Sequence, residues 1–102
     1  MTFKFFITIF VLALIHPHSA MANSVNDEAL NLASQKKFAE SLKLLSNQTQ
    51  VEKSQYDHRF LKARILSWSG SYKAARLELD LLLSQYPNNA DLLLALANLE
   101  YY

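Results

Sequence analysis

Apolar residues recur along most of the chain at intervals of three or four positions, the spacing that places side chains on one face of an α-helix. The pattern is clearest in the segment 72–86, where positions 72, 75, 79, 82, 83 and 86 are apolar. Patterns of this kind predict five helices, at 26–35, 38–48, 56–69, 72–86 and 90–102. The polar segment 46–55 is the loosest connection between them. The sequence therefore predicts an all-α fold.

A repeating period organises these helices. When the sequence is aligned with itself at an offset of 34, Ala29, Ala63 and Ala97 share a column, Leu32 aligns with Leu66, Phe38 with Tyr72 and Leu45 with Leu79. Two helices that pack closely need a small side chain where their axes cross, because a larger one holds them apart. We therefore expect Ala63 and Ala75 to lie at the contact between helices 56–69 and 72–86.

Glycine and proline mark the ends of the two clearest helices. Gly70 is the only glycine in the 102 residues, and it follows the helix 56–69 at a point where a left-handed backbone conformation would strain any other residue. Pro87 cannot continue a helical hydrogen-bond ladder, and the two asparagines after it tolerate a turn. These residues predict a turn after each helix.

The 34-residue period is the length of a tetratricopeptide repeat, or TPR. Residues 56–89 resemble one such repeat, because they carry the family's signature residues Ala63, Leu66, Gly70, Tyr72, Ala75, Leu79 and Pro87. The first helix matches only in part: Arg59 and Lys62 stand where the family often has tryptophan and leucine. In the second helix, Leu82 replaces a usual alanine.

The rest of the chain resembles the same repeat less completely. Residues 22–55 resemble a degenerate repeat in which Lys36, Ser41 and Lys53 replace the glycine, the small alanine and the proline. Residues 90–102 resemble the first helix of a third repeat. The resemblance implies antiparallel helix-turn-helix repeats, a TPR-like α-solenoid of about two and a half repeats, within a domain at 23–102.

Residues 1–22 have the organisation of a secretory signal peptide. Lys4 provides a positive charge, 5–15 is an apolar run, and Ala20-Met21-Ala22 fits a cleavage site. The alternative is a membrane anchor, but eleven apolar residues make only about 16 Å of helix, whereas a bilayer core of about 30 Å needs nearer twenty. We therefore expect an exported protein without a stable membrane anchor after cleavage. Because the chain has no cysteine, it has neither a disulfide nor a lipid attachment site, which fits a bacterial periplasm.

The remaining composition excludes several kinds of chemistry. Ten basic and nine acidic residues leave no strongly basic surface, which argues against binding to nucleic acid. Beyond residue 22, His58 is the one histidine, and the sequence has no motif for a nucleophile, a metal or a cofactor. We interpret His58 as a surface residue and predict that the protein is not an enzyme.

The resemblance also implies where a partner binds. In TPR arrays the first helices of successive repeats line a concave groove, which here places Asn26, Leu30, Phe60, Leu61, Arg64, Trp68, Leu94, Asn98 and Tyr101 on that surface. Arg64 and Trp68 lie four residues apart and so share a helix face. They are either a binding pair in the groove, or a core tryptophan covered by the arginine stem. Some TPR domains hold a peptide's terminal carboxylate, but this sequence has Leu30, Leu61, Asp91 and Ala95 at most of the positions that do so.

The last predicted helix is strongly apolar and begins a repeat that stays unfinished. Asp91 and Glu100 are its only charged residues, and its apolar residues beyond the alanines are Leu92, Leu93, Leu94, Leu96, Leu99, Tyr101 and Tyr102. Repeat arrays need polar surfaces at their ends. We therefore expect the amino-terminal part of a longer protein, an exported TPR scaffold for protein–protein interaction in the periplasm or in outer-membrane assembly. The alternative is a structural module that self-associates through 90–102.

Overall fold

The chain is all-helical in the computed structural model, which describes residues 18–101, and these residues include no β-strand. The helices are α2 (His18–Ser34), α3 (Phe38–Ser46), α4 (Gln50–Lys53), α5 (Tyr56–Trp68), α6 (Tyr72–Gln85) and α7 (Ala90–Leu99). The predicted all-α fold class is therefore confirmed. No helix in this part of the chain has both the length and the apolar character needed to cross a membrane.

The first helix begins well before its predicted start at residue 26. Residues 18–22, which the sequence assigns to the signal peptide, form the start of α2. The rest of the predicted signal peptide, 1–17, lies outside the described residues. Helical propensity explains the difference in part, because alanine and methionine in 18–22 favour a helix that runs directly into the amphipathic segment.

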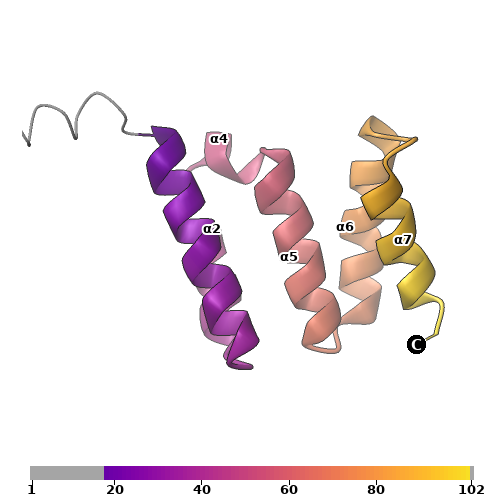
Figure 1. Cartoon of the computed structure of the whole chain (residues 1–102), viewed down its shortest axis with the longest axis horizontal. Helices are drawn as coiled ribbons and strands as arrows, with labels where there is room; N and C mark the ends of the chain where they lie inside the picture. The colour runs from indigo at the N-terminus through magenta and orange to yellow at the C-terminus, as the bar shows by residue number, and fades with distance from the viewer. Residues whose placement is uncertain (1–17, 102) are drawn as a thin grey trace, which may run out of the picture.

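The helices form two antiparallel hairpins, α2–α3 and α5–α6, and α7 packs at the end of the row (Figure 1). Helix α5 is central, because it contacts α2 and α3 on one side and α6 and α7 on the other. The amino-terminal ends of α2, α5 and α7 lie at the same end of the molecule (Figure 1). These three helices are the ones whose exposed residues define the candidate site.

The two hairpins turn in the same way. Gly70 has φ +89°, which confirms the predicted left-handed turn, and Lys36, its counterpart in the self-alignment, has φ +63°. In the first turn the Lys37 N–H donates to the Leu32 carbonyl over 2.9 Å, and the Lys36 N–H donates to the Ala33 carbonyl over 2.9 Å. These two bonds form a Schellman motif, which satisfies the last carbonyls of a helix.

The turn after α5 contains the same pair of bonds. The Ser71 N–H donates to the Leu66 carbonyl over 2.8 Å, and the Gly70 N–H donates to the Ser67 carbonyl over 3.1 Å. The offset found in the sequence relates each donor and each acceptor to its counterpart in the first turn. The degenerate first hairpin therefore keeps the turn geometry without the glycine, and Lys36 bears the backbone strain.

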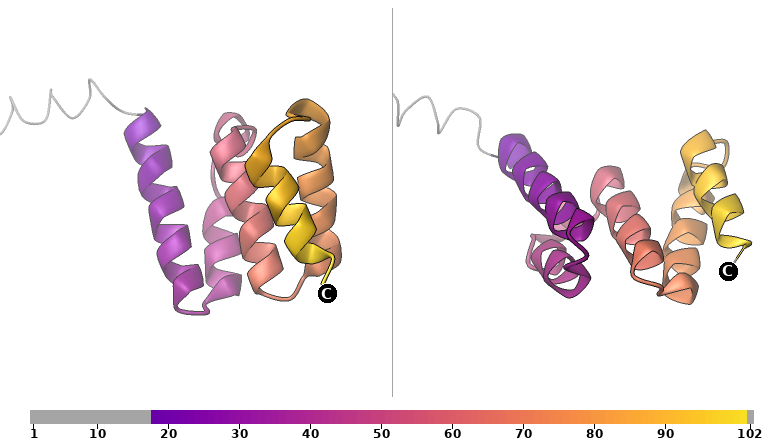
Figure 2. Two further views of the ribbon diagram at one scale, coloured as in Figure 1. Left: turned by 45° about the vertical axis from the view of Figure 1, so that its right-hand side comes forward. Right: turned by 60° about the horizontal axis from the view of Figure 1, so that its bottom comes forward.

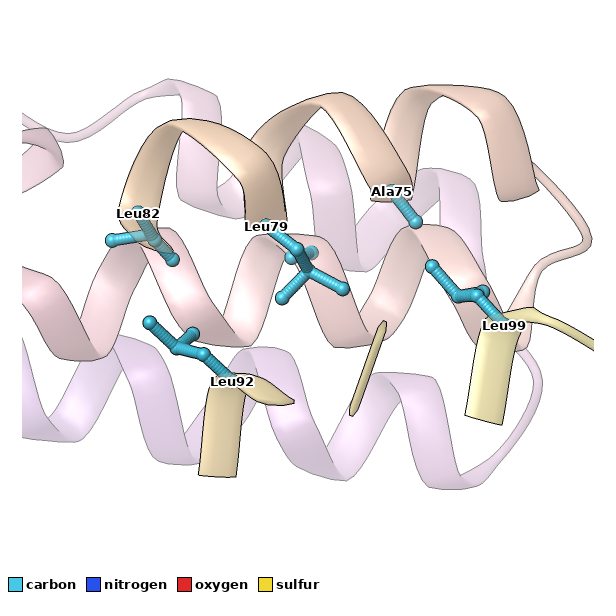
Figure 3. Packing of buried hydrophobic residues seen from close by; sticks show 6 residues of the cluster. Ala75, Leu79, Leu82, Leu92 and Leu99 are labelled. Atoms are coloured by element: carbon cyan, nitrogen blue, oxygen red, sulfur yellow. The ribbon is translucent and has the colours of Figure 1, made fainter. Parts of the chain in front are cut away.

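Small residues lie where the helices of each hairpin cross. Ala63 and Ala75 are fully buried in one cluster with Leu79, Leu82, Leu92 and Leu99 (Figure 3). In the first hairpin, Ala29 and Ser41 are also fully buried. The Ser41 hydroxyl donates to the Ala29 carbonyl over 2.6 Å. Serine fits this dry contact because its hydroxyl finds an acceptor there.

A second cluster joins the hairpins to each other. It contains Ala29 and Ala33 of α2, Leu45 of α3, and Leu61 and Ile65 of α5. Leu61 was expected on the concave surface; most of its side chain is buried in this cluster, with 8% of its surface exposed. Helix α5 thus contributes to both clusters, with Ala63 in one and Leu61 and Ile65 in the other.

The polar segment 46–55 contains a helix that we did not predict. The short α4 begins after Thr49, whose hydroxyl accepts from the Glu52 N–H over 3.2 Å. The Thr-x-x-Glu spacing of these two residues is a known signal for the start of a helix. Apolar spacing did not predict this helix, because a polar helix of four residues has no apolar face.

Helix α7 buries part of its apolar surface. Leu92 and Leu99 are buried against the α5–α6 hairpin, so they are not available at the surface. Leu93, Leu94 and Tyr101 are exposed to 47%, 63% and 87%. The expected apolar face therefore persists in reduced form on the outer side of α7.

The shared turn geometry predicts opposite effects for substitutions at its two equivalent positions. Gly70→Lys is expected to lower the free energy of unfolding by about 1 kcal/mol through backbone strain alone, because a Cβ at Gly70 meets no atom within 4 Å. Lys36→Gly is expected to raise it by up to about 1 kcal/mol. Urea denaturation followed by circular dichroism measures both changes. The control is Lys37→Gly, since Lys37 has φ −89° and gains nothing from glycine; an equal gain there would contradict the strain argument.

Candidate functional site

A groove lies between α5 and α7, with Leu79 of α6 at its base. It has a volume of about 750 Å³. Six of the predicted site residues line it: Phe60, Arg64, Trp68, Leu94, Asn98 and Tyr101. Helix α7 lies beside α6 and contacts α5 (Figure 2), and its residues Leu94 and Asn98 line the groove.

A smaller hollow of about 420 Å³ lies between α2 and α5. The other three predicted site residues, Asn26, Leu30 and Leu61, line it together with Asp27 and Asp57. Phe60 and Arg64 line both the hollow and the groove, and they form the ridge between them. All nine predicted residues therefore line two adjoining hollows, which are formed by α2, α5, α7 and Tyr101, a residue that follows α7.

The ridge residue Arg64 lies against two aromatic rings. Its guanidinium carbon is 4.9 Å from the centroid of the Trp68 ring and 5.7 Å from that of Phe60. The Phe60 ring is in turn held by Tyr56, with centroids 5.7 Å apart. Cation–π contacts of this kind contribute about 0.5–1 kcal/mol at exposed sites, so they restrict the orientation of the guanidinium.

Trp68 is 46% exposed and lines the groove, so it is not a core residue packed between helices. The core-facing positions of α5 are occupied by Leu61, Ala63 and Ile65. Trp68 is the last residue of α5 and lies one turn beyond Arg64 on the exposed face. Of the two interpretations of this pair, the structure favours a paired surface in the groove.

Arg64 has no acidic partner within the described part of the chain. The ion pairs there are Lys62–Glu78, with Nζ and Oε1 3.2 Å apart, and Arg76–Glu100, with Nη1 and Oε1 2.9 Å apart. Both pairs link neighbouring helices away from Arg64. The guanidinium therefore stacks on rings through its face, while its N–H groups make no hydrogen bond within residues 18–101.

Three carboxylates lie around the same surface. Asp27 and Asp57 line the hollow between α2 and α5, and Asp91 lines the groove. Asp57 and Asp91 stand in the first turns of α5 and α7, where a negative charge complements the helix dipole. The surface thus has an acidic end and, farther along α5, a cationic and aromatic end.

An amide acceptor lies buried in the hollow. The Oδ1 atom of Asn26 is shielded from solvent and has no hydrogen-bond partner among the described residues. A buried acceptor without a donor costs free energy, roughly 1–3 kcal/mol. Asn26 was predicted to be a site residue, and it lines the hollow, although its Oδ1 is shielded.

His58 is buried, so the expectation of a surface histidine is wrong. Its Nδ1 is hydrogen-bonded to Oε1 of Gln48, and this contact joins α5 to the segment between α3 and α4. Burial lowers the pKa of His58 below its ordinary value of 6.5, and the positive charges of Lys62 and Lys53 lower it further. The residue that occupies the equivalent place in α7, Leu92, is also buried. His58 therefore acts in packing.

No cluster of potential metal ligands occurs among residues 18–101. Comparisons with known proteins give no relative: no protein-family model, no curated protein and no solved structure matches this chain. Inference about its function therefore rests on the chain's own residues.

The buried histidine predicts a loss of stability in mild acid. The unfolded chain takes up the proton near pH 6.5, whereas the folded chain resists it, so stability is complete above that pH and falls as the pH decreases below it. We expect the melting temperature to fall between pH 7 and pH 5, measured by circular dichroism. In His58→Leu this loss is expected to be smaller, because leucine does not titrate. An equal loss in both proteins would show that other groups cause it.

Proposed function

We propose that this protein is an exported, non-enzymatic scaffold of the TPR type, which binds a segment of a partner protein across α2, α5 and α7. The observation that carries the proposal is that all nine residues chosen from the sequence line two adjoining hollows on one surface. These residues come from three helices related by the period of the sequence. A surface that recurs in this way is typical of arrays that hold extended peptides.

The regularity of the helices supports the repeat architecture. Helices α3 and α6 begin at Phe38 and Tyr72, and α5 and α7 begin at Tyr56 and Ala90. Each pair of starts is separated by the 34-residue offset, as the turn residues Lys36 and Gly70 are. These recurring starts and turns support the proposal of a solenoid built at the period found in the sequence.

The surface has the composition of a binding site for protein. Exposed tryptophan and arginine side chains are over-represented among the residues that contribute most to binding energy. Helices packed about 8–10 Å apart place α2 and α7 roughly 20 Å from each other, and an extended chain of about six to nine residues spans that distance. Export to the periplasm is supported by the leader at 1–22 and by the absence of cysteine.

Trp68 provides a direct test, because it is the only tryptophan in the chain and its emission reports on the groove. The purified protein is screened against a library of amide-capped random nonapeptides. We expect bound peptides to shift the emission of Trp68, and we expect Trp68→Ala to weaken their binding at least tenfold, measured by fluorescence anisotropy of labelled peptides. The control is Leu77→Ala, which removes another exposed apolar residue from α6. Equal weakening by both substitutions would contradict a site at the groove.

The second candidate function is self-association through α7, and a difference between the two ends of the array favours it. The positions of α5 that pack on the first hairpin are His58, Leu61 and Ile65, and their counterparts in α7 are Leu92, Ala95 and Leu99. On α2 the counterparts are Ser24, Asp27 and Asn31, which are polar and exposed. The α2 end is thus closed by a polar surface, whereas the outer face of α7 is apolar. Two copies would therefore pair α7 to α7 rather than head to tail.

Sedimentation velocity distinguishes this second candidate. If α7 pairs with its copy, Leu93→Lys is expected to convert dimers to monomers, because a charge at the contact would lose its water. Leu77→Lys is the matched control, since Leu77 is 62% exposed but lies on α6. A protein that is monomeric at tens of micromolar, or one that Leu93→Lys leaves dimeric, excludes pairing through this face.

A further inference from the structure

We infer that the segment bound in the groove carries an internal aspartate or glutamate side chain that pairs with Arg64, close to a large apolar residue that covers Leu94 and Trp68. This inference rests on the proposed function and specifies the chemistry of its partner. Its basis is the unmatched guanidinium on the ridge between the two hollows, together with the apolar walls of the groove beside it.

Arg64 is prepared to bind an anion. The centroids of the Trp68 and Phe60 rings lie 4.9 Å and 5.7 Å from its guanidinium carbon. The N–H groups at the edge of the planar guanidinium match the two oxygens of a carboxylate. Because these N–H groups have no partner within residues 18–101, a carboxylate from outside has no internal competitor. The rings have already restricted the side chain, which reduces the entropy lost on binding.

The nearby aspartates do not replace that partner. Asp57 precedes Arg64 by seven positions, which corresponds to about 10 Å along the helix, roughly the distance over which salt screens exposed charges. Asp91 lies in the corresponding first turn of α7. Both charges already complement helix dipoles. Asp27, the third carboxylate of this surface, lines the hollow with Asp57. A ligand carboxylate is therefore expected at Arg64 and not at the acidic end.

The groove beside Arg64 selects the neighbouring residue of the ligand. Leu94 of α7 and Tyr101, which follows α7, are exposed and line the groove together with Trp68, so an apolar side chain bound there removes apolar surface from water. An extended segment with an acidic residue over the ridge and an apolar residue over the groove satisfies both features.

The experiment uses the same library of amide-capped random nonapeptides, in which no peptide has a free terminal carboxylate. We expect peptides bound by the purified protein to be enriched in aspartate or glutamate near a leucine or an aromatic residue. For a selected peptide, replacing its acidic residue by the corresponding amide is expected to weaken binding about tenfold or more. The variant Arg64→Gln is expected to bind both forms equally, while Asp57→Asn is expected to retain the preference for the acid.

The outcomes distinguish a failure of the inference about Arg64 from a failure of the proposed function. If wild-type protein binds peptides through Trp68 but shows no acidic preference, or prefers lysine and arginine, the inference about Arg64 is wrong and the proposed function stands. If Arg64→Gln keeps the preference, another group selects the acid and the inference is again wrong. If the wild-type protein retains no peptide above the level of Trp68→Ala, the proposed function itself is wrong. A far-ultraviolet spectrum unchanged in Arg64→Gln shows that the variant is folded.

Discussion

The close approach of paired helices is the constraint on which the rest of the structure depends. At each crossing the side chain must be small, and the residues there are Ala63 with Ala75 in one hairpin and Ala29 with Ser41 in the other. Burying the hydroxyl of Ser41 without a partner would cost free energy, but the hydroxyl donates a hydrogen bond to the carbonyl of Ala29 over 2.6 Å. Because the two helices of each hairpin pack closely, α5 can contact the first hairpin as well as its own partner α6. This one helix therefore contributes residues to both cores. The groove follows from this arrangement, since the exposed face of α5 carries Arg64 and Trp68, beside Phe60, which packs in part against the core of the second hairpin.

The fold could be predicted from the sequence to the extent that it depends on spacing. Apolar periodicity located five helices, and the 34-residue offset located the crossings and the turn at Gly70. The same offset selected residues of α2, α5 and α7 that proved to share one surface. Spacing predicts these features because the rise per residue of an α-helix is fixed. Residues separated by the offset therefore occupy corresponding positions on their helices. The solenoid as a family architecture and the binding role go further than spacing alone and remain proposals.

Other features could not be predicted, because they depend on contacts between segments. The burial of His58 follows from a partner, Gln48, that lies in a segment without apolar pattern. The burial of Leu61 follows from its contacts with residues of α2 and α3, which the pattern of α5 alone does not encode. The left-handed backbone conformation at Lys36 could not be predicted from the residue type, since lysine rarely adopts it. The short α4 did carry a signal in Thr49 and Glu52, but no apolar pattern supported it.

The attachment of α7 has a consequence for how the groove would respond to a partner. Leu92 and Leu99 anchor the helix, each contributing about 1.5–3 kcal/mol at most, and an exposed ion pair between Arg76 and Glu100 adds little more. One wall of the groove is therefore held less firmly than the other, and it can detach by local unfolding while α5 stays in place. A ligand that touches both walls binds only the closed form, so its occupancy and the order of α7 are thermodynamically linked. Binding of a ligand to both walls would then stabilise α7 in its packed position.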